Sequence, residues 1–281
     1  MSSRRSAALV LFGLALPSLA ACGSGEPPPL AAEQILMSGG TYQLGSHTEE
    51  RRLGYELSPP AVRDAGWYDA WESPLRDVDV RPFAIDRTPV TQSEYAEFVA
   101  ATGHQPPAID SAAYRRQGFL VHPFSQVEPF LWSGGSPPVG FDDHPVVLVS
   151  RDDAVAYCAW RGAEEGRRLR LPTELEWEAS CRGMPPRTFP WGNEWDERFA
   201  QVEATSTASV WAHPDGATPE GVLEMAGNVF EWTGSAMANG NPTIKSCSWD
   251  DAPGTCRCAF RHGRPAEARH ILIGFRCAEG R

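Results

Sequence analysis

The stretch GVLEMAGNVFEWT, residues 221–233, places two carboxylates in a run that is otherwise rich in large apolar side chains. Such a run is expected in the core of a protein. Glu224 and Glu231 therefore need partners, because burying an unpaired carboxylate is very costly. Gly227 and Asn228 stand between them, and the glycine lets the backbone turn so that its carbonyl groups face inward.

Two kinds of partner fit this pattern. A hard cation is one, because a site built only from oxygen ligands suits calcium. The other is a tight turn in which both glutamates pair with arginines such as Arg261 or Arg276. The spacing alone leaves both interpretations open.

The first 22 of the 281 residues have the features of an export signal. Arg4 and Arg5 precede an apolar run over residues 7–21, which is too short to span a bilayer. The run ends in LAAC, residues 19–22, the pattern at which bacterial lipoproteins are cut. We therefore expect Cys22 to become a lipid-bearing N-terminus.

Residues 23–34 contain mainly Gly, Ser, Pro and Ala, which indicates a flexible tether. The predicted product is exported and lipid-anchored to the bacterial cell envelope through Cys22, so the membrane is its first partner. Because Gly23 rather than Asp follows the cysteine, we expect the outer membrane.

Residues 35–281 carry no second linker and no internal repeat, so their length favours one domain. The net charge of −11 argues against nucleic acid as a partner. The chain has 26 Gly, 25 Pro and 10 Trp, a composition that indicates a loop-rich domain held by large aromatic side chains.

Six cysteines follow Cys22, and an even number in an exported chain indicates disulfides. Spacing alone does not choose among the possible pairings. No Cys-x-x-Cys pair is present, which disfavours zinc. The six are Cys158, Cys181, Cys247, Cys256, Cys258 and Cys277.

Capping boxes predict the starts of three helices, because each pairs a hydroxyl with an acid three residues later. The first helix is expected to end at Gly103. The three boxes are Thr91 with Glu94, Ser150 with Asp153, and Thr173 with Glu176.

Strands are predicted between and around these helices. We expect an opening hairpin strand within residues 36–46, a strand over 78–85 and a buried strand over 144–149, with short strands within 245–277. Residues 102–143 are rich in proline and are expected to form a long ordered loop with at most short strands. Helices separated in this way by strands and loops predict an α+β fold.

Taken together in this order, seven motifs resemble the sulfatase-modifying-factor family, whose best-known member is the formylglycine-generating enzyme. The resemblance covers nearly the whole predicted mature chain. The motifs are GGTYQLGS (39–46), PVTQSEY (89–95), AVAYCAW (154–160), RLPTELEWE (170–178), FPWGN (189–193), GNVFEWT (227–233) and GFR (274–276).

The resemblance implies a loop-rich single domain with a variant of the C-type-lectin fold, supported by calcium. Carried over residue by residue, it implies calcium ligands from the side chains of Glu224 and Glu231 and from the backbone carbonyls of Gly227 and Val229.

Disulfide pairings are also implied by the resemblance. It pairs Cys158 with Cys277 and Cys181 with Cys258. Cys247 and Cys256 are left over.

Enzymes of this family use two thiolates that bind Cu(I) to oxidise a sulfatase cysteine, and soft thiolates suit that ion. Counted from Ser248, the first of the two catalytic positions falls on Asp251 and the second on Cys256. Counted back from Arg257, the turn is three residues short and Cys256 is out of register. An Asp-Asp pair here is the pattern of members that lack the oxidase chemistry.

Two alternatives remain for the turn. Cys247 and Cys256 could together hold copper, but we expect them to form a third disulfide. Asp250, Asp251 and His262 could form a new polar site, but we expect a solvated turn.

Two histidines in loops are not counted among the candidate catalytic residues. His122 and His144 precede prolines in loops and are expected to be structural. The candidate catalytic residues are therefore Ser248, Asp251, Cys247 and Cys256.

Two functions follow from these expectations. The favoured one is a surface-tethered module without oxidase activity that binds a protein, peptide or glycan or assists a modification in the envelope. The alternative is a copper-dependent oxidase that converts a sulfatase cysteine to formylglycine. Fold alone does not decide between them.

Overall fold

Three helices begin at the predicted capping boxes: α4 (Gln92–Thr102), α7 (Arg151–Glu164) and α8 (Glu174–Arg182). In each, the capping hydroxyl accepts a hydrogen bond from the backbone N–H three residues later, and the acid at that position accepts one from the capping residue's N–H. Helix α4 ends at Gly103, whose φ of 71° lies in the left-handed region. Local side-chain chemistry therefore sets where these helices begin.

The structure, a computed structural model, describes residues 33–118 and 122–280. The predicted signal peptide, Cys22 and most of the predicted tether lie outside the described residues. Among the described residues, no helix has the length and apolar character needed to cross a membrane. The other helices are α1 (Thr48–Glu56), α2 (Pro60–Asp64), α3 (Trp67–Trp71), α5 (Ser111–Arg116) and α6 (Phe124–Val127), with 3-10 turns η1 (Glu128–Phe130), η2 (Glu197–Phe199), η3 (Pro214–Gly216) and η4 (Pro253–Cys256).

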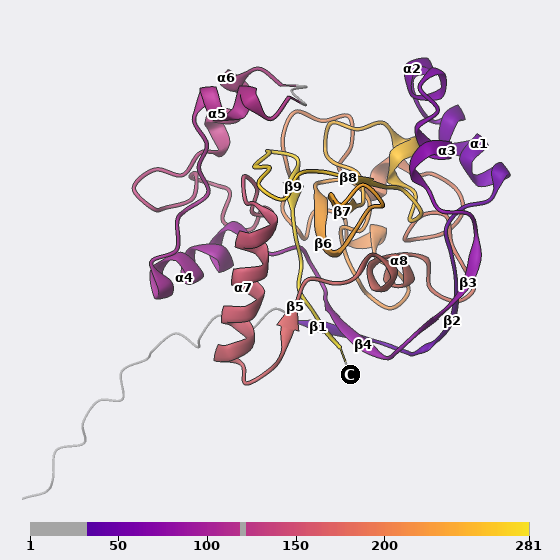
Figure 1. The fold of residues 1–281 in the computed structure, drawn as a ribbon, viewed down its shortest axis with the longest axis horizontal. Coiled ribbons are helices and arrows are strands. Elements are labelled where there is room, and N and C mark those ends of the chain that lie inside the picture. Colours follow the sequence, from indigo (N-terminus) through magenta and orange to yellow (C-terminus); the bar gives the residue numbers. More distant parts are fainter. Residues whose placement is uncertain (1–32, 119–121, 281) are drawn as a thin grey trace, which may run out of the picture. The chain divides into compact units, whose positions relative to one another are not determined.

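In the described part of the chain, short strands form two four-stranded sheets and one two-stranded sheet (Figure 1). The first sheet has the order β1-β4-β10-β5, the second pairs β2 with β3, and the third has the order β8-β7-β6-β9. The strands are β1 (Gln34–Met37), β2 (Gly40–Leu44), β3 (Arg76–Val80), β4 (Phe83–Asp86), β5 (Leu169–Arg170), β6 (Phe230–Ala236), β7 (Pro242–Lys245), β8 (Arg261–Gly263), β9 (Ile273–Gly274) and β10 (Ala278–Gly280). The mixture of helices and mostly antiparallel strands confirms the α+β prediction.

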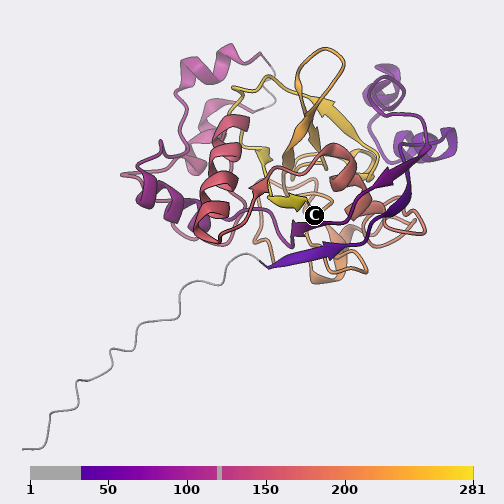
Figure 2. The same cartoon turned by 60° about the horizontal axis from the view of Figure 1, so that its bottom comes forward.

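The third sheet carries the stretch with which the sequence analysis began. Strand β6 starts at Phe230 and pairs antiparallel with β7 and parallel with β9. Figure 2 shows the hairpin of β6 and β7 extending beyond the rest of its sheet. The sheet thus brings β6 and the short strands of the C-terminal part side by side.

Several predicted strands are wrong in detail. β1 pairs with β4 and β2 pairs with β3, so residues 36–46 do not form a hairpin. The strand expected over 78–85 is split into β3 and β4 around Pro82, which has no N–H to donate to a strand partner. Residues 144–149 are largely buried but form no strand, and Leu148 has a φ of 60°.

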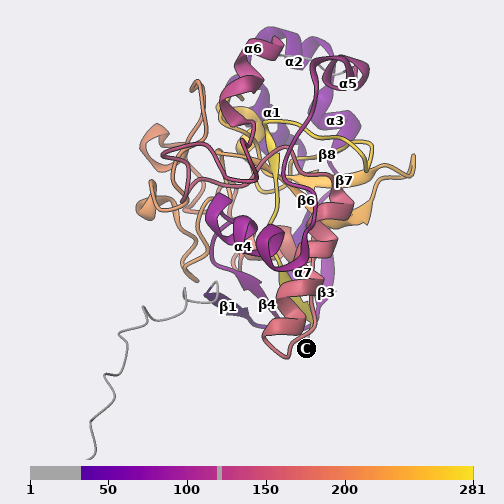
Figure 3. The same ribbon diagram turned by 90° about the vertical axis from the view of Figure 1, so that its left-hand side faces the viewer.

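Short helices stand in two regions where none was predicted. The long segment 102–143 contains α5 and α6 rather than short strands, and α1 to α3 precede β3. Figures 1 and 3 show α4 beside α7, in agreement with the contacts between them. Figure 1 shows α1, α2 and α3 on the other side of the strands from α4 and α7.

Three disulfides cross-link the described residues. Cys158 in α7 is bonded to Cys277, and Cys181 in α8 is bonded to Cys258, which confirms the two pairings implied by the family resemblance. The third joins Cys247 to Cys256, as expected. All six cysteines are buried.

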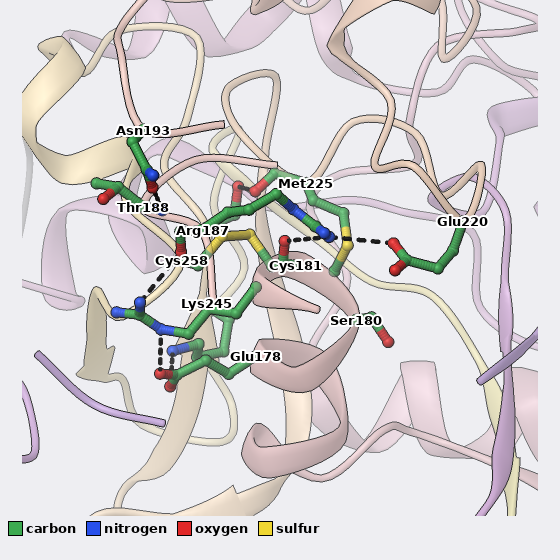
Figure 4. The surroundings of a disulfide bond; sticks show 12 residues. Glu178, Ser180, Cys181, Arg187, Thr188, Asn193, Glu220, Met225, Lys245 and Cys258 are labelled. Atoms are coloured by element: carbon green, nitrogen blue, oxygen red, sulfur yellow. Dashed lines mark hydrogen bonds and ion pairs between the residues drawn. A yellow bond between two sulfur atoms is a disulfide. The ribbon is translucent and has the colours of Figure 1, made fainter. Parts of the chain in front are cut away.

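Buried charges surround the second of these disulfides (Figure 4). The ammonium of Lys245, which is fully buried, lies 2.9 Å from Glu178 Oε2. The guanidinium of Arg182 donates to Glu178 Oε1 over 3.1 Å. Burial raises the pKa of the Glu178 carboxyl, but Lys245 and Arg182 outweigh it and leave that pKa below its ordinary value.

Candidate functional site

Arg276 forms an ion pair with the carboxylate of Glu231 through two hydrogen bonds. Its Nε donates to Oε2 and its Nη2 to Oε1, each over 2.7 Å, and both side chains are fully buried. The indole N–H of Trp177 adds a third hydrogen bond of 2.9 Å to Oε2. Of the two alternatives for Glu231, arginine pairing is the one found. Arg261, the other arginine considered, pairs instead with Glu174 at 2.6 Å.

Glu224 has different partners. Its Oε1 lies 3.2 Å from Nδ1 of His213, and its Oε2 accepts a 3.1 Å hydrogen bond from the amide of Asn228. Gly227 lies against residue 201, because a Cβ at Gly227 would come within 2.5 Å of the carbonyl oxygen of Gln201. The glycine is thus required by packing, and its N–H donates to the sulfur of Cys247.

These contacts do not fit a calcium ion held by Glu231. A guanidinium already stands at both oxygens of that carboxylate, and a second cation beside it would be repelled. Among the described residues, no group of three or more His, Cys, Asp or Glu side chains is placed to hold a metal. Calcium held through Glu224 and the carbonyls of Gly227 and Val229 stays a prediction.

The turn that follows β7 is not a solvated turn, which corrects the expectation for Asp250 and Asp251. Ser248 is fully buried, and its backbone N–H donates to Asp251 Oδ2 over 2.9 Å. Its hydroxyl lies 2.7 Å from Asp250 Oδ1 and also within hydrogen-bond distance of Asp251 Oδ2. The three polar side chains therefore form one closed cluster.

The cluster of Ser248, Asp250 and Asp251 needs one more proton than the Ser248 hydroxyl supplies. The Ser248 hydroxyl has one hydrogen and can donate to only one carboxylate at a time. The second contact is satisfied when one carboxyl is protonated and donates to the hydroxyl oxygen. Burial, and after it the neighbouring Asp250, raise the pKa of Asp251 to about 7, against hydrogen bonds from Ser248 that lower it. Asp251 is thus the acid that holds a proton near neutral pH.

His122 joins this cluster, although it was expected to have only a structural role. Its Nε2 lies 2.8 Å from Asp250 Oδ2, and its Nδ1 lies 2.6 Å from the side-chain oxygen of Gln126. His144 lies elsewhere, 2.9 Å from the hydroxyl of Thr207, and burial lowers its pKa. Only the first of these two histidines therefore contacts the Asp250 carboxylate.

A cavity of about 140 Å³ opens beside the cluster. Its walls are mainly apolar and aromatic, and its polar lining comes from two aspartates, two histidines and an arginine. The lining residues are Trp67, Trp71, Phe230, Ile244, Asp250, Asp251, Phe260, His262, Arg264, His270, Leu272 and Ile273.

Helix α3 supplies two tryptophans to this cavity, and the sequence analysis missed them. Trp67 and Trp71 are four residues apart, so they lie on one face of a helix, and that spacing is the signal that could have revealed them. An ion pair between Glu72 and Arg257, both fully buried, fixes the end of α3 beside η4. The tryptophans are thereby held against the turn that bears the aspartates.

His262 is the most unusual polar residue of the cavity. It is 3% exposed, and its Nδ1 has no hydrogen-bond partner among the described residues. Its ring stacks on Trp71 with centroids 5.4 Å apart and meets Phe230 edge-on at 4.7 Å. Burial, together with Arg264, lowers its pKa well below the ordinary value, so the ring is neutral. An unsatisfied buried nitrogen costs about 1–3 kcal/mol.

The sulfur atoms of Cys247 and Cys256 do not fit copper. Both are buried and joined to each other, so neither is a thiolate. By the count from Ser248, Asp251 is the residue that the family resemblance places at the first catalytic position. The candidate site brings together Ser248 and Asp251 of the predicted catalytic residues, while the two cysteines form the disulfide beside them.

The fold and the site define a disulfide-bonded α+β domain in which the turn after β7 carries two aspartates and a disulfide. The chain belongs to the family of the sulfatase-modifying factor enzyme 1-like domain, whose sequence model matches residues 24–281. This result confirms the family resemblance found in the sequence.

Relatives include both inactive and active members. The chain is 31% identical to the inactive C-alpha-formylglycine-generating enzyme 2 of Bos taurus, over 88% of this chain and 87% of the relative. It is 35% identical to the formylglycine-generating enzyme of Mycobacterium tuberculosis, over 58% of this chain and 66% of the relative.

Among solved structures, PvdO from Pseudomonas aeruginosa shares the fold. The TM-score is 0.68, and the match covers 88% of this chain and 94% of PvdO at 24% sequence identity. A likeness at that identity shows the fold alone.

Proposed function

We propose that this protein is an envelope-tethered lipoprotein whose domain binds a protein, peptide or glycan, or assists a modification, without oxidase activity. The observation that carries the proposal is the Cys247–Cys256 disulfide beside Asp251. Copper-dependent oxidation needs two free thiolates, and this turn offers a disulfide and carboxylates instead. The aromatic cavity beside Asp251 supports a binding role.

The alternative is a copper-dependent oxidase that converts a sulfatase cysteine to formylglycine. Cys247 and Cys256 favour it only if their disulfide is reduced in the working protein, since reduction would release two neighbouring thiols. The similarity to the formylglycine-generating enzyme of Mycobacterium tuberculosis supports this alternative.

An oxidase assay separates the two functions. The purified protein, as isolated and after reduction, is supplied with Cu(I), oxygen and a sulfatase peptide that carries the cysteine to be modified. We expect no aldehyde in either state, as measured by hydrazide labelling and mass spectrometry. The formylglycine-generating enzyme of Mycobacterium tuberculosis is the positive control, and aldehyde formation by the reduced protein would support the oxidase.

The binding role is tested in cells. A photo-reactive amino acid at position 67, on the cavity wall, is expected to cross-link one envelope partner. The same group at Glu164, in the last turn of α7, is the control. Equal cross-linking from both positions would contradict a role for the cavity.

A further inference from the structure

The unpartnered nitrogen of His262 points to an occupant of the cavity. His262 lines the cavity and is 3% exposed, yet its Nδ1 has no partner among the residues described. Buried polar groups in proteins are almost always hydrogen-bonded. A neutral imidazole has one donor and one acceptor nitrogen, so the partner of Nδ1 must donate or accept according to the tautomer. A hydroxyl group can do both.

The size and walls of the cavity narrow the choice. Its volume of about 140 Å³ is close to the roughly 150 Å³ of an apolar cavity that binds benzene. Trp67 and Trp71 stack on each other with centroids 5.1 Å apart, and Phe260 and Phe230 add further apolar wall. A single aromatic ring matches this space in volume and in polarity.

Charges at the cavity disfavour an ionic occupant. Arg264 and Asp250 give the cavity lining two charges of opposite sign, so the lining as a whole favours neither a cation nor an anion. Asp251 adds a carboxyl group that can exchange hydrogen bonds with an uncharged ligand, because the Ser248 cluster holds an extra proton. The occupant is therefore expected to be neutral.

We propose that the cavity binds an uncharged phenol-type ring whose hydroxyl hydrogen-bonds to Nδ1 of His262, as the tyrosine side chain of a peptide would. This inference rests on the proposed binding function and specifies its ligand. The ring lies among Trp67, Trp71 and Phe260, and the carboxyl group of Asp251 completes the polar lining.

Two probes that differ by one oxygen test the proposal: N-acetyltyrosinamide and N-acetylphenylalaninamide. The full-length protein is purified in a detergent without aromatic rings, and binding is followed by tryptophan fluorescence and ligand-observed NMR. A site that hydrogen-bonds a hydroxyl discriminates strongly against the ligand that lacks it. We expect the tyrosine probe to bind at least about tenfold more tightly. Equal affinity for the two probes would overturn the proposal.

His262→Phe removes the nitrogen and keeps a ring against Trp71. We expect this variant to bind both probes with the same, weaker affinity, while His47→Phe, at an exposed histidine, keeps the preference. In wild type, the ¹⁵N shift of His262 Nδ1 should move with the tyrosine probe and not with the phenylalanine probe, a readout that does not depend on whether the variant folds. An unmoved shift, or preferential binding of glucose, benzylamine or benzoate, would overturn the proposal.

The outcomes also separate this inference from the proposed function. Failure of the tyrosine probe together with absence of aldehyde in the oxidase assay would remove the phenol ligand and leave the non-oxidase module. Formation of aldehyde would remove the non-oxidase module whatever the probe result.

Discussion

Arg276 holds both carboxylate oxygens of Glu231 through two hydrogen bonds of 2.7 Å, with neither side chain exposed to solvent. The same guanidinium donates to the backbone carbonyls of Asp86 and Leu223 over 3.0 and 2.9 Å. The pair thus connects β6 with the end of β4, with the segment before β6 and with the segment after β9. The guanidinium lies at the carboxylate for which the family resemblance implied a calcium ion.

Removing one partner of this pair should destabilise the fold strongly. We expect Glu231→Gln to lower the free energy of unfolding by about 3–5 kcal/mol, because it leaves the Arg276 guanidinium buried without a counter-charge. Urea unfolding measures the change. Glu56→Gln, which breaks the exposed pair with Arg52, is the matched control and should cost less than about 1 kcal/mol.

Calcium can be separated from this ion pair with a chelator. A calcium ion that binds only the folded form raises stability by RT ln(1 + [L]/Kd). Since Arg276 takes the Glu231 carboxylate, we expect chelator to change the Tm of wild type and of Glu231→Gln by the same amount. A Tm that falls with chelator in wild type but not in Glu231→Gln would establish the calcium site predicted from the sequence.

Asp251 should make stability fall as pH rises. Its folded pKa of about 7 lies above the ordinary value of 3.8, so the folded state binds the proton more tightly than the unfolded chain does. The stabilisation is complete below about pH 4 and is lost progressively up to about pH 7, with a slope of at most about 1.4 kcal/mol per pH unit.

Asp251→Asn tests this pH dependence. The variant removes the titrating group while keeping the shape of the side chain. We expect it to be more stable than wild type at pH 8, with the difference shrinking toward pH 4, as measured by urea unfolding across this range. Asp250→Asn should narrow the pH window, because it removes the neighbouring charge that raises the Asp251 pKa. A wild-type slope equal to that of Asp251→Asn would contradict the assignment.

Features that depend on neighbouring residues could be predicted from the sequence. The capping boxes at Thr91, Ser150 and Thr173 act over three residues, so reading the chain locally was enough to place α4, α7 and α8. The family resemblance supplied the long-range pairings of Cys158 and Cys181, which spacing alone could not.

The site itself depends on contacts between distant segments. Asp250 and Asp251 resemble a solvated turn in sequence because Trp67 and Trp71, which line the same cavity, lie far earlier in the chain. The role of His122 likewise requires a contact across 128 positions with Asp250. No local pattern encodes such contacts.

Lipidation at Cys22 is a prediction that concerns residues outside the described part of the chain. We expect Cys22→Ala to release the protein from the membrane fraction or to leave its signal peptide uncut. Mass spectrometry of the N-terminus, together with membrane fractionation, measures both outcomes. An unmodified N-terminus on membrane-bound wild type would contradict the predicted anchor.

The number of free thiols distinguishes the non-oxidase module from the copper-dependent oxidase. Labelling of the unreduced protein should find no free thiol among the six cysteines of the described residues, because all six are in disulfides. Labels on Cys247 and Cys256 after purification without reductant would instead support the copper-dependent oxidase.

The same disulfide can be tested through stability. In the loop-entropy model, a disulfide that spans 9 residues stabilises by about 2–3 kcal/mol, and one that spans 119 residues by about 5 kcal/mol. We therefore expect the double change Cys247→Ser with Cys256→Ser to cost roughly half as much as Cys158→Ser with Cys277→Ser, measured by urea unfolding. If the first variant were as stable as wild type, the two sulfurs would not be joined in the working protein, and the case against copper would lose its basis.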